Sequence, residues 1–172
     1  RDGYVVLDFL DRAEAASLAA AYEDLQGDLG HPAFASTIMS RDARYRLAVS
    51  ATIAGTFARA IAATFRDVRF FWGNFNVKFP HAGLGAVPLH QDPSFLDERE
   101  ACPLGIWVPL VDTHAENGAL QVIPASHTLL SQPRCGGAPF PYNHLQETLL
   151  ARFGRMLPMQ AGQAYVGSPA LF

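Results

Sequence analysis

The first part of the chain places apolar residues at helical spacing. Residues 2–10 open with an apolar run typical of a short strand, and Asp11 with Glu14 forms a capping box, the signature of a helix N-terminus. This helix is expected to end at Gly27, since glycine commonly follows the last helical turn. A longer helix is predicted over residues 44–65, where apolar residues recur every three or four positions. The residues between the two helices are predicted to form a loop.

From Val68 onward the apolar positions recur with period two, which indicates strands. In the first of these strands, Asn76 and Lys78 would lie on the polar face, opposite Val77. Segments rich in glycine and proline separate the apolar runs, as loops do. Further strands are predicted over residues 89–94, 105–111, 120–124 and 163–172. Loops are predicted over residues 81–87 and 131–142. A third helix is predicted to be capped by Asn143 and to end at Gly154.

Two helices followed by short strands predict a fold that is mainly β with flanking helices. The architecture expected from this order is a jelly roll with the helices packed outside the sheets. A chain of 172 residues is long enough for one domain with its own core. We therefore expect a single domain over residues 1–172, with a helical scaffold at 11–66 and a jelly-roll part at 68–172.

The composition and net charge of the chain argue against nucleic acid and membranes as binding partners. The chain is 49% hydrophobic and 17% charged, which is typical of a folded domain. Its net charge of −3 offers no basic surface for nucleic acid and no polybasic patch for a membrane. No uninterrupted apolar stretch is expected to span a bilayer. Cys102 and Cys135 lie far apart in the sequence and lack Cys-x-x-Cys spacing, so we expect free thiols in a reducing, cytoplasmic compartment. The alternative is a single disulfide between them.

The triplet His90-Gln91-Asp92 is the main candidate for chemistry. On a strand, residues two apart point to the same face, so the imidazole of His90 and the carboxylate of Asp92 would project together. One histidine and one carboxylate are two of the three ligands of a 2-His-1-carboxylate iron site, which leaves coordination positions open for a cosubstrate and oxygen. The triplet is short, so its surroundings must support this interpretation.

The most specific segment follows at residues 107–127. It contains Trp107 on an apolar run, the pair Asn117-Gly118, and a strand that ends in Pro124-Ala125-Ser126-His127. Asn117 and Gly118 are expected to supply the positive-φ residues of a tight turn between two strands. Together with His90-Gln91-Asp92, this segment resembles the phytanoyl-CoA dioxygenase family of iron(II)/2-oxoglutarate oxygenases. In that family the last motif reads Pro-Gly-Ser-His, so Ala125 stands in place of a glycine.

The resemblance implies a double-stranded β-helix, a cupin-like jelly roll, that holds iron(II) and the cosubstrate 2-oxoglutarate. It also implies that His90 and Asp92 bind the metal, and that Trp107 lies beside the cosubstrate. The presence of Asp92 favours hydroxylation, because halogenating relatives lack this carboxylate. Lys78 or Asn76 would hydrogen-bond a cosubstrate carboxylate if their strand face points inward. The alternatives are an exposed edge face for Lys78 and Asn76, and core packing for Trp107.

The remaining histidines have weaker claims to a role. His127 is expected to be structural, although it is the best remaining histidine for a third ligand. His81 lies in a glycine-rich loop that would fold over the site as a lid. By the family pattern, the second iron-binding histidine falls at or just past Phe172, and the arginine that holds 2-oxoglutarate falls further on. Gly162-Gln163 replaces the family's Gly-Asp pair ahead of that histidine.

The sequence therefore predicts a jelly roll that is truncated at its C-terminus. The predicted function is an iron(II)/2-oxoglutarate-dependent dioxygenase that uses oxygen to hydroxylate a small organic molecule and decarboxylates 2-oxoglutarate to succinate. The alternative is a non-catalytic jelly-roll remnant that binds a small molecule without the third metal ligand. A third option, a cupin-like metal enzyme with another chemistry, would need more histidines near the first motif.

Overall fold

The structure is a computed structural model that describes residues 1–172 except 26, 30–32, 80–86, 131 and 137–139. The chain divides into two compact units. The strand unit comprises Arg1–Asp8 and Pro88–Phe172, and the helical unit comprises Phe9–Val87. The predicted lid loop with His81 lies outside the described residues.

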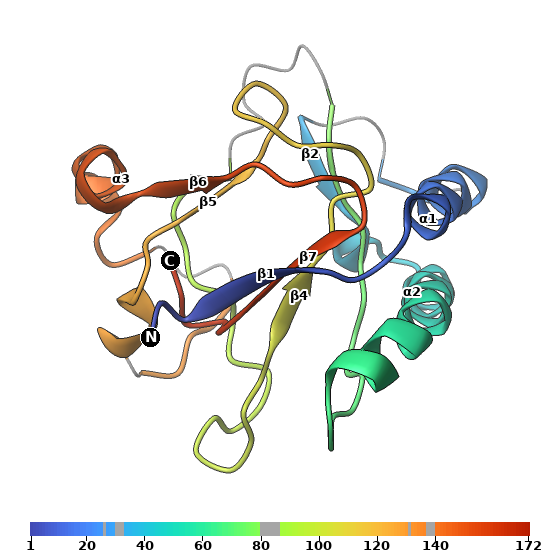
Figure 1. The fold of residues 1–172 in the computed structure, drawn as a ribbon, viewed down its shortest axis with the longest axis horizontal. Helices are drawn as coiled ribbons and strands as arrows, with labels where there is room; N and C mark the ends of the chain where they lie inside the picture. The colour runs from blue at the N-terminus through green and yellow to red at the C-terminus, as the bar shows by residue number, and fades with distance from the viewer. Residues whose placement is uncertain (26, 30–32, 80–86, 131, 137–139) are drawn as a thin grey trace. The chain divides into compact units, whose positions relative to one another are not determined.

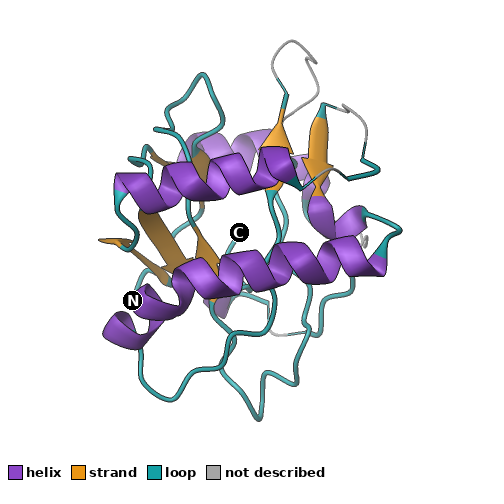
Figure 2. Ribbon diagram, turned by 90° about the vertical axis from the view of Figure 1, so that its right-hand side faces the viewer, coloured by secondary structure: helices purple, strands orange, loops and turns teal. Residues whose placement is uncertain are grey.

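The helical unit contains two long helices that run side by side, α1 (Arg12–Asp24) and α2 (Ala43–Thr64) (Figure 2). The predicted capping box is confirmed at the start of α1, where the Asp11 carboxylate accepts a bond from the Glu14 backbone at 2.8 Å and the Glu14 carboxylate accepts one from the Asp11 backbone at 2.9 Å. These two bonds satisfy main-chain donors that have no partner inside the helix.

The second helix buries one side and exposes the other. Its buried residues include Tyr45, Val49, Ile53 and Phe57, and the Phe57 ring meets that of Phe9 edge-on, with centroids 5.1 Å apart. By length and composition alone, α2 also qualifies as a candidate membrane span, so the expectation that no stretch would qualify does not hold among the described residues. A core helix of a soluble protein passes the same test.

The helical unit also contains a small two-stranded sheet. Strand β2 (Phe34–Ser36) pairs antiparallel with β3 (Asn76–Lys78), and a 3₁₀ turn follows β2 at Thr37–Met39. The prediction that residues 28–43 form a loop was therefore wrong for β2. Three residues are too few to show a periodic pattern, and only pairing with β3 makes them a strand.

The strand unit is organised around a three-stranded antiparallel sheet. In Figure 1, β7 (Gln163–Gly167) lies between β1 (Tyr4–Asp8) and β4 (Gly105–Trp107). The register places Tyr4 and Gly105 opposite Gly167, and Trp107 opposite Tyr165. The remaining elements are the paired strands β5 (Leu120–Val122) and β6 (Arg155–Leu157), the helix α3 (Gln146–Phe153), and 3₁₀ turns at Ser126–Thr128 and Asn143–Leu145.

Two apolar clusters hold the strand unit together. The first consists of Leu89, Ile123, Phe140 and Phe172, and the rings of Phe140 and Phe172 meet with centroids 4.7 Å apart. The second cluster packs beneath the sheet and consists of Val122, Leu157, Met159 and Leu171 with partly buried neighbours that include Trp107 and Tyr165. Because Leu89 precedes His90, the first cluster anchors the segment that carries the candidate metal ligands.

The jelly roll is only partly supported. The described residues form several small sheets and no closed barrel. The predicted strand over residues 89–94 is absent, because Pro88, Pro93 and the facing Pro169 have no N–H groups and a regular ladder needs them. The strand predicted over 163–172 ends at Gly167, and the one predicted over 105–111 ends at Trp107.

Two smaller predictions about turns need correction. Asn143 does not cap α3; it begins the 3₁₀ turn that precedes the helix, whereas Gly154 ends α3 as predicted. In the Asn117-Gly118 turn, only Gly118 has a positive φ, of 99°. Asn117 contributes through its side chain, which accepts a bond from the His114 backbone at 2.7 Å and donates one to the Asp112 carbonyl at 2.8 Å.

Candidate metal centre

The segment that carries His90 and Asp92 is extended and held by main-chain contacts. The Asp92 N–H donates to the Pro169 carbonyl at 2.9 Å, and the Gln91 side chain donates to the Ala170 carbonyl at 2.6 Å. On the other side, the Leu89 N–H donates to the Gln146 side chain of α3 at 2.7 Å. The triplet thus runs beside the residues that follow β7, although it is not a regular strand.

The imidazole of His90 is oriented by the carbonyl group of Pro88, two residues earlier in the chain. Its Nδ1 lies 2.8 Å from the Pro88 carbonyl oxygen. A carbonyl oxygen only accepts hydrogen bonds, so Nδ1 carries the proton in this contact. In the neutral ring, Nε2 then has a free lone pair, which is the state in which histidine binds a metal.

The two candidate ligands converge as the spacing predicted. His90 Nε2 and Asp92 Oδ1 are 3.7 Å apart, with side chains 55% and 58% exposed. Two atoms that each lie about 2.1 Å from one metal ion can be no more than about 4.2 Å apart, so this pair meets the requirement. The Asp92 carboxylate raises the pKa of His90 above its ordinary value of 6.5, against the opposing effect of burial. Both groups are open to a ligand, and their chemistry fits a divalent metal ion.

A third ligand is not present among the residues that the structure describes. No group of three or more His, Cys, Asp and Glu side chains in this part of the chain could hold one ion. His127, the best remaining histidine, packs its imidazole against Gly3, where a Cβ would come within 2.3 Å of Nδ1. His114 and His144 lie on the surface, in a turn and in a 3₁₀ helix.

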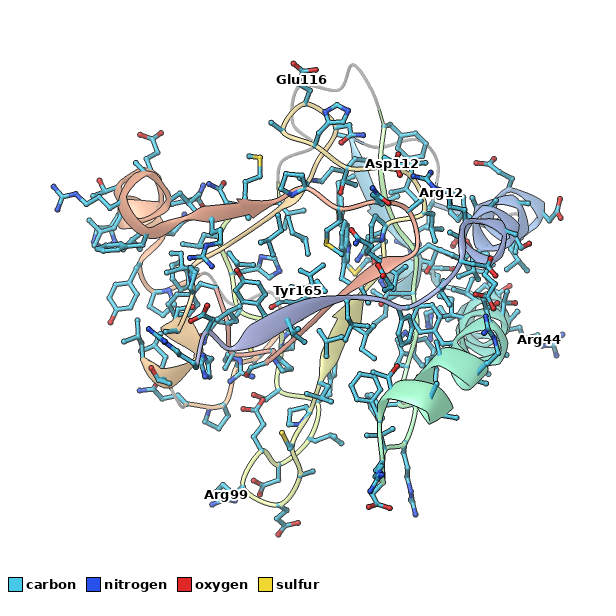
Figure 3. All side chains as sticks on the ribbon, in the orientation of Figure 1. Arg12, Arg44, Arg99, Asp112, Glu116 and Tyr165 are labelled. Carbon is cyan, nitrogen blue, oxygen red and sulfur yellow. The ribbon has the colours of Figure 1, made fainter. Side chains whose placement is uncertain are left out.

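The sheet presents two glycines and a tyrosine next to Asp92. Gly105 of β4 pairs with Gly167 of β7, and a Cβ at Gly105 would lie 3.9 Å from Asp92 Oδ2. Tyr165, labelled in Figure 3, lies two residues before Gly167 on β7, and residues two apart on a strand share a face. Burial, with a further contribution from the Asp92 charge, raises the pKa of the Tyr165 hydroxyl to about 12. This phenol therefore stays protonated at neutral pH and can donate a hydrogen bond at this edge of the site.

The sequence did not reveal that Arg134 and Glu98 belong to this region. Arg134 Nε donates to the Asp92 carbonyl at 2.8 Å, and its Nη1 and Nη2 both donate to the Glu98 carboxylate. Arg134 lies in the segment predicted as a proline-rich surface loop, yet its side chain is only 10% exposed. A salt bridge between residues so far apart leaves no local pattern, so no signal in the sequence would have found it.

The residues predicted to bind a cosubstrate fall in different units. Trp107 is on β4 in the strand unit, opposite Tyr165, and packs against the second apolar cluster. Asn76 and Lys78 are exposed on β3 in the helical unit, where Asn76 accepts a bond from the Asn74 side chain at 3.0 Å. Their roles toward 2-oxoglutarate stay predictions.

The Pro-Ala-Ser-His motif and the residue before it hold the segment that follows β7 through hydrogen bonds to Phe172. The Ser126 hydroxyl accepts a bond from the Phe172 N–H at 2.9 Å, and the Ile123 N–H donates to the Phe172 carbonyl at 2.6 Å. Ala125 adopts a left-handed conformation with φ of 64° and ψ of 0°. Glycine takes this conformation without strain, which explains why the family pattern has glycine at this position.

Comparison with known proteins identifies the family. The family model described as phytanoyl-CoA dioxygenase (PhyH) matches residues 1–172. The chain belongs to the phytanoyl-CoA dioxygenase family. Members of this family are generally iron(II)/2-oxoglutarate-dependent oxygenases, so the resemblance seen in the sequence is confirmed.

Curated relatives within the phytanoyl-CoA dioxygenase family match a shorter stretch. Phytanoyl-CoA dioxygenase domain-containing protein 1 of Bos taurus is 52% identical over 52 residues, which are 30% of this chain and 18% of the relative. The protein of the same name from Mus musculus is 48% identical over 52 residues, again 18% of its length. The match thus spans less than a fifth of either relative.

Proposed function

We propose that this chain is the metal-binding part of an iron(II)/2-oxoglutarate-dependent dioxygenase that hydroxylates a small organic molecule. The observation that carries the proposal is the convergence of His90 Nε2 and Asp92 Oδ1, 3.7 Å apart. Membership of the phytanoyl-CoA dioxygenase family supports it independently. The iron ion, when bound, would supply the activation of oxygen that is coupled to decarboxylation of 2-oxoglutarate to succinate.

The chain's own residues would prepare the site for that chemistry. The Pro88 carbonyl holds the His90 ring with Nε2 free, so little rotation is needed when a metal arrives. Asp92 supplies the negative charge that favours a divalent cation. Tyr165 would donate a hydrogen bond from its protonated hydroxyl to an oxygen atom of a bound cosubstrate or substrate.

The cosubstrate would be held by residues outside the metal ligands. Trp107 would contribute an apolar wall beside it. The third iron ligand is proposed to be a histidine just past Phe172 in the full-length protein. The support for this position is that Pro169 and Ala170 run alongside Asp92 and Gln91.

The test is turnover and metal binding by the full-length protein. With iron(II), 2-oxoglutarate and oxygen we expect succinate formation, and with cobalt(II) under anaerobic conditions we expect stoichiometric binding. His90→Ala and Asp92→Ala should abolish succinate formation and should weaken cobalt binding strongly, because each removes a ligand. His144→Ala removes an exposed histidine from a 3₁₀ helix and should change neither. Absence of both succinate and metal binding in the wild-type protein would refute the proposal.

A non-catalytic remnant is the second candidate, and one observation favours it. The described residues bring together two candidate ligands and no third. A remnant would bind 2-oxoglutarate or another small carboxylate without iron, and calorimetry in the presence of a chelator would detect this. Chelator-resistant binding with no succinate formation would support the remnant over the dioxygenase.

A further inference from the structure

Arg134 is placed to hold the main chain of the residue that carries the candidate carboxylate ligand. Its Nε donates to the Asp92 carbonyl at 2.8 Å. From the opposite direction, the Asp92 N–H is bound to the Pro169 carbonyl at 2.9 Å. Both main-chain polar groups of Asp92 are therefore occupied, while its side chain is 58% exposed. The direction of the carboxylate then depends on this backbone anchorage.

The Arg134 side chain is itself held rigidly. Its two terminal nitrogens both donate to the Glu98 carboxylate, a bidentate contact that fixes the plane of the guanidinium group. The Ser94 hydroxyl donates to Glu98 Oε1 at 3.1 Å and accepts from the Arg134 N–H at 3.2 Å, and the Ser94 N–H donates to the Arg134 carbonyl at 2.9 Å. The Arg134 side chain is largely buried, with 10% of it exposed, and the Glu98 side chain is partly exposed, at 29%.

The charge balance of this arrangement suits a cation site. An unpaired arginine next to Asp92 would repel a divalent metal ion and compete for the carboxylate. Here Glu98 neutralises the guanidinium charge, and the Arg134 contact with Asp92 is to the carbonyl oxygen. The contact therefore orients Asp92 and leaves its carboxylate free.

We propose that Arg134, backed by Glu98 and Ser94, is a positioning residue that holds Asp92 in the orientation in which its carboxylate binds the metal. This inference rests on the proposed role of Asp92 as a ligand. Arg134 acts through Asp92 and does not touch the metal. Removal of a hydrogen-bond partner that orients a ligand typically lowers metal affinity by about ten- to a hundredfold.

The test measures cobalt(II) affinity of the full-length protein by anaerobic calorimetry, at a temperature where each variant is folded by circular dichroism. Arg134→Gln should raise the dissociation constant by about tenfold or more. Arg99→Gln is the matched control. Arg99 forms its ion pair with the nearby Asp97 and lies on an exposed loop (Figure 3), so this variant should bind as the wild type does.

A double-mutant cycle distinguishes positioning from a general structural role. If Arg134 acts through the Asp92 side chain, Arg134→Gln should have no further effect on the residual affinity of an Asp92→Ala protein. An equal loss in both backgrounds would overturn the inference. Glu98→Gln provides a second variant should Arg134→Gln fail to fold. It keeps the shape of the partner and should weaken cobalt binding by a smaller factor, and wild-type affinity in this variant would also count against the inference.

Hydrogen exchange of the Asp92 amide in the metal-free protein separates this inference from the proposed function. Arg134→Gln should speed exchange of this amide, because its bond to Pro169 loses the support of the neighbouring contact. Faster exchange with no cobalt binding by the wild-type protein would contradict the proposed function alone. Equal cobalt affinity of wild type and Arg134→Gln would contradict the positioning role alone.

Discussion

The hydroxyl group of Tyr165 lies directly over the α-carbon of Gly167, two residues further along the same strand. A Cβ at position 167 would come within 2.2 Å of Tyr165 Oη and 2.5 Å of Cζ. Tyr165 is also stacked on Tyr4 of the neighbouring strand, with ring centroids 5.6 Å apart. The phenol beside Asp92 therefore keeps its position because residue 167 has no side chain.

Gly167→Ala is expected to destabilise the fold because the rigid Tyr165 ring cannot move aside without losing its stacking on Tyr4. Overpacking of this kind lowers the free energy of unfolding by about 1–3 kcal/mol. Denaturant unfolding followed by circular dichroism would measure it. Gly55→Ala is the control, since nothing lies within 4 Å of a Cβ there. In the interior of α2 this change should stabilise by about 0.5–1 kcal/mol. Equal effects of the two variants would contradict the steric argument.

Ala125→Gly is expected to stabilise the protein, in contrast to most substitutions by glycine. Ala125 has φ of 64°, a conformation that costs an L-residue about 1–2 kcal/mol and glycine almost nothing. After the added entropy of the unfolded chain, we expect a gain of roughly 0.5–1 kcal/mol in the free energy of unfolding. Ala20→Gly, on the exposed side of α1, should instead lose about 1 kcal/mol. A loss at both positions in the same urea titration would show that position 125 is unstrained.

Ser126→Ala tests how firmly the segment after β7 is held. The Ser126 hydroxyl is buried and accepts the Phe172 N–H at 2.9 Å, so its removal leaves a buried donor without this partner. The expected loss in the free energy of unfolding is about 1–3 kcal/mol. Hydrogen exchange should locate the effect at residues 168–172. Ser17→Ala, on an exposed turn of α1, should leave both stability and this exchange unchanged within about 0.5 kcal/mol.

Glu98 is expected to make stability depend on pH in the acid range. The hydrogen bonds from Arg134 hold the pKa of the Glu98 carboxyl below its ordinary value of 4.5. A lowered pKa in the folded state means that the stabilisation is fully present above about pH 4.5 and is lost as pH falls through the lower folded value. Glu98→Gln should therefore cost about 1–2 kcal/mol at pH 7 and progressively less below pH 4. Unfolding at pH 7 and pH 3 would check this, and a cost independent of pH would contradict it.

The sequence by itself determined the features that depend on residues a few positions apart. The capping box of Asp11 and Glu14 formed as predicted, and so did the long helix α2, within one residue at each end. The proximity of His90 and Asp92 also followed from a spacing of two in an extended chain, and it did not require the regular strand that was predicted. In each case local backbone geometry decides which groups meet.

Only the tertiary structure decided what surrounds those two ligands. Arg134 and Glu98 meet across 36 residues of sequence, and the Gln91 side chain reaches the Ala170 carbonyl across 79. Tyr165 comes beside Asp92 through the pairing of β7 with β4. Such contacts depend on chain reversals and strand registers that leave no periodic signal. The sequence could therefore name a candidate ligand pair, while the residues that orient it became visible only in the folded chain.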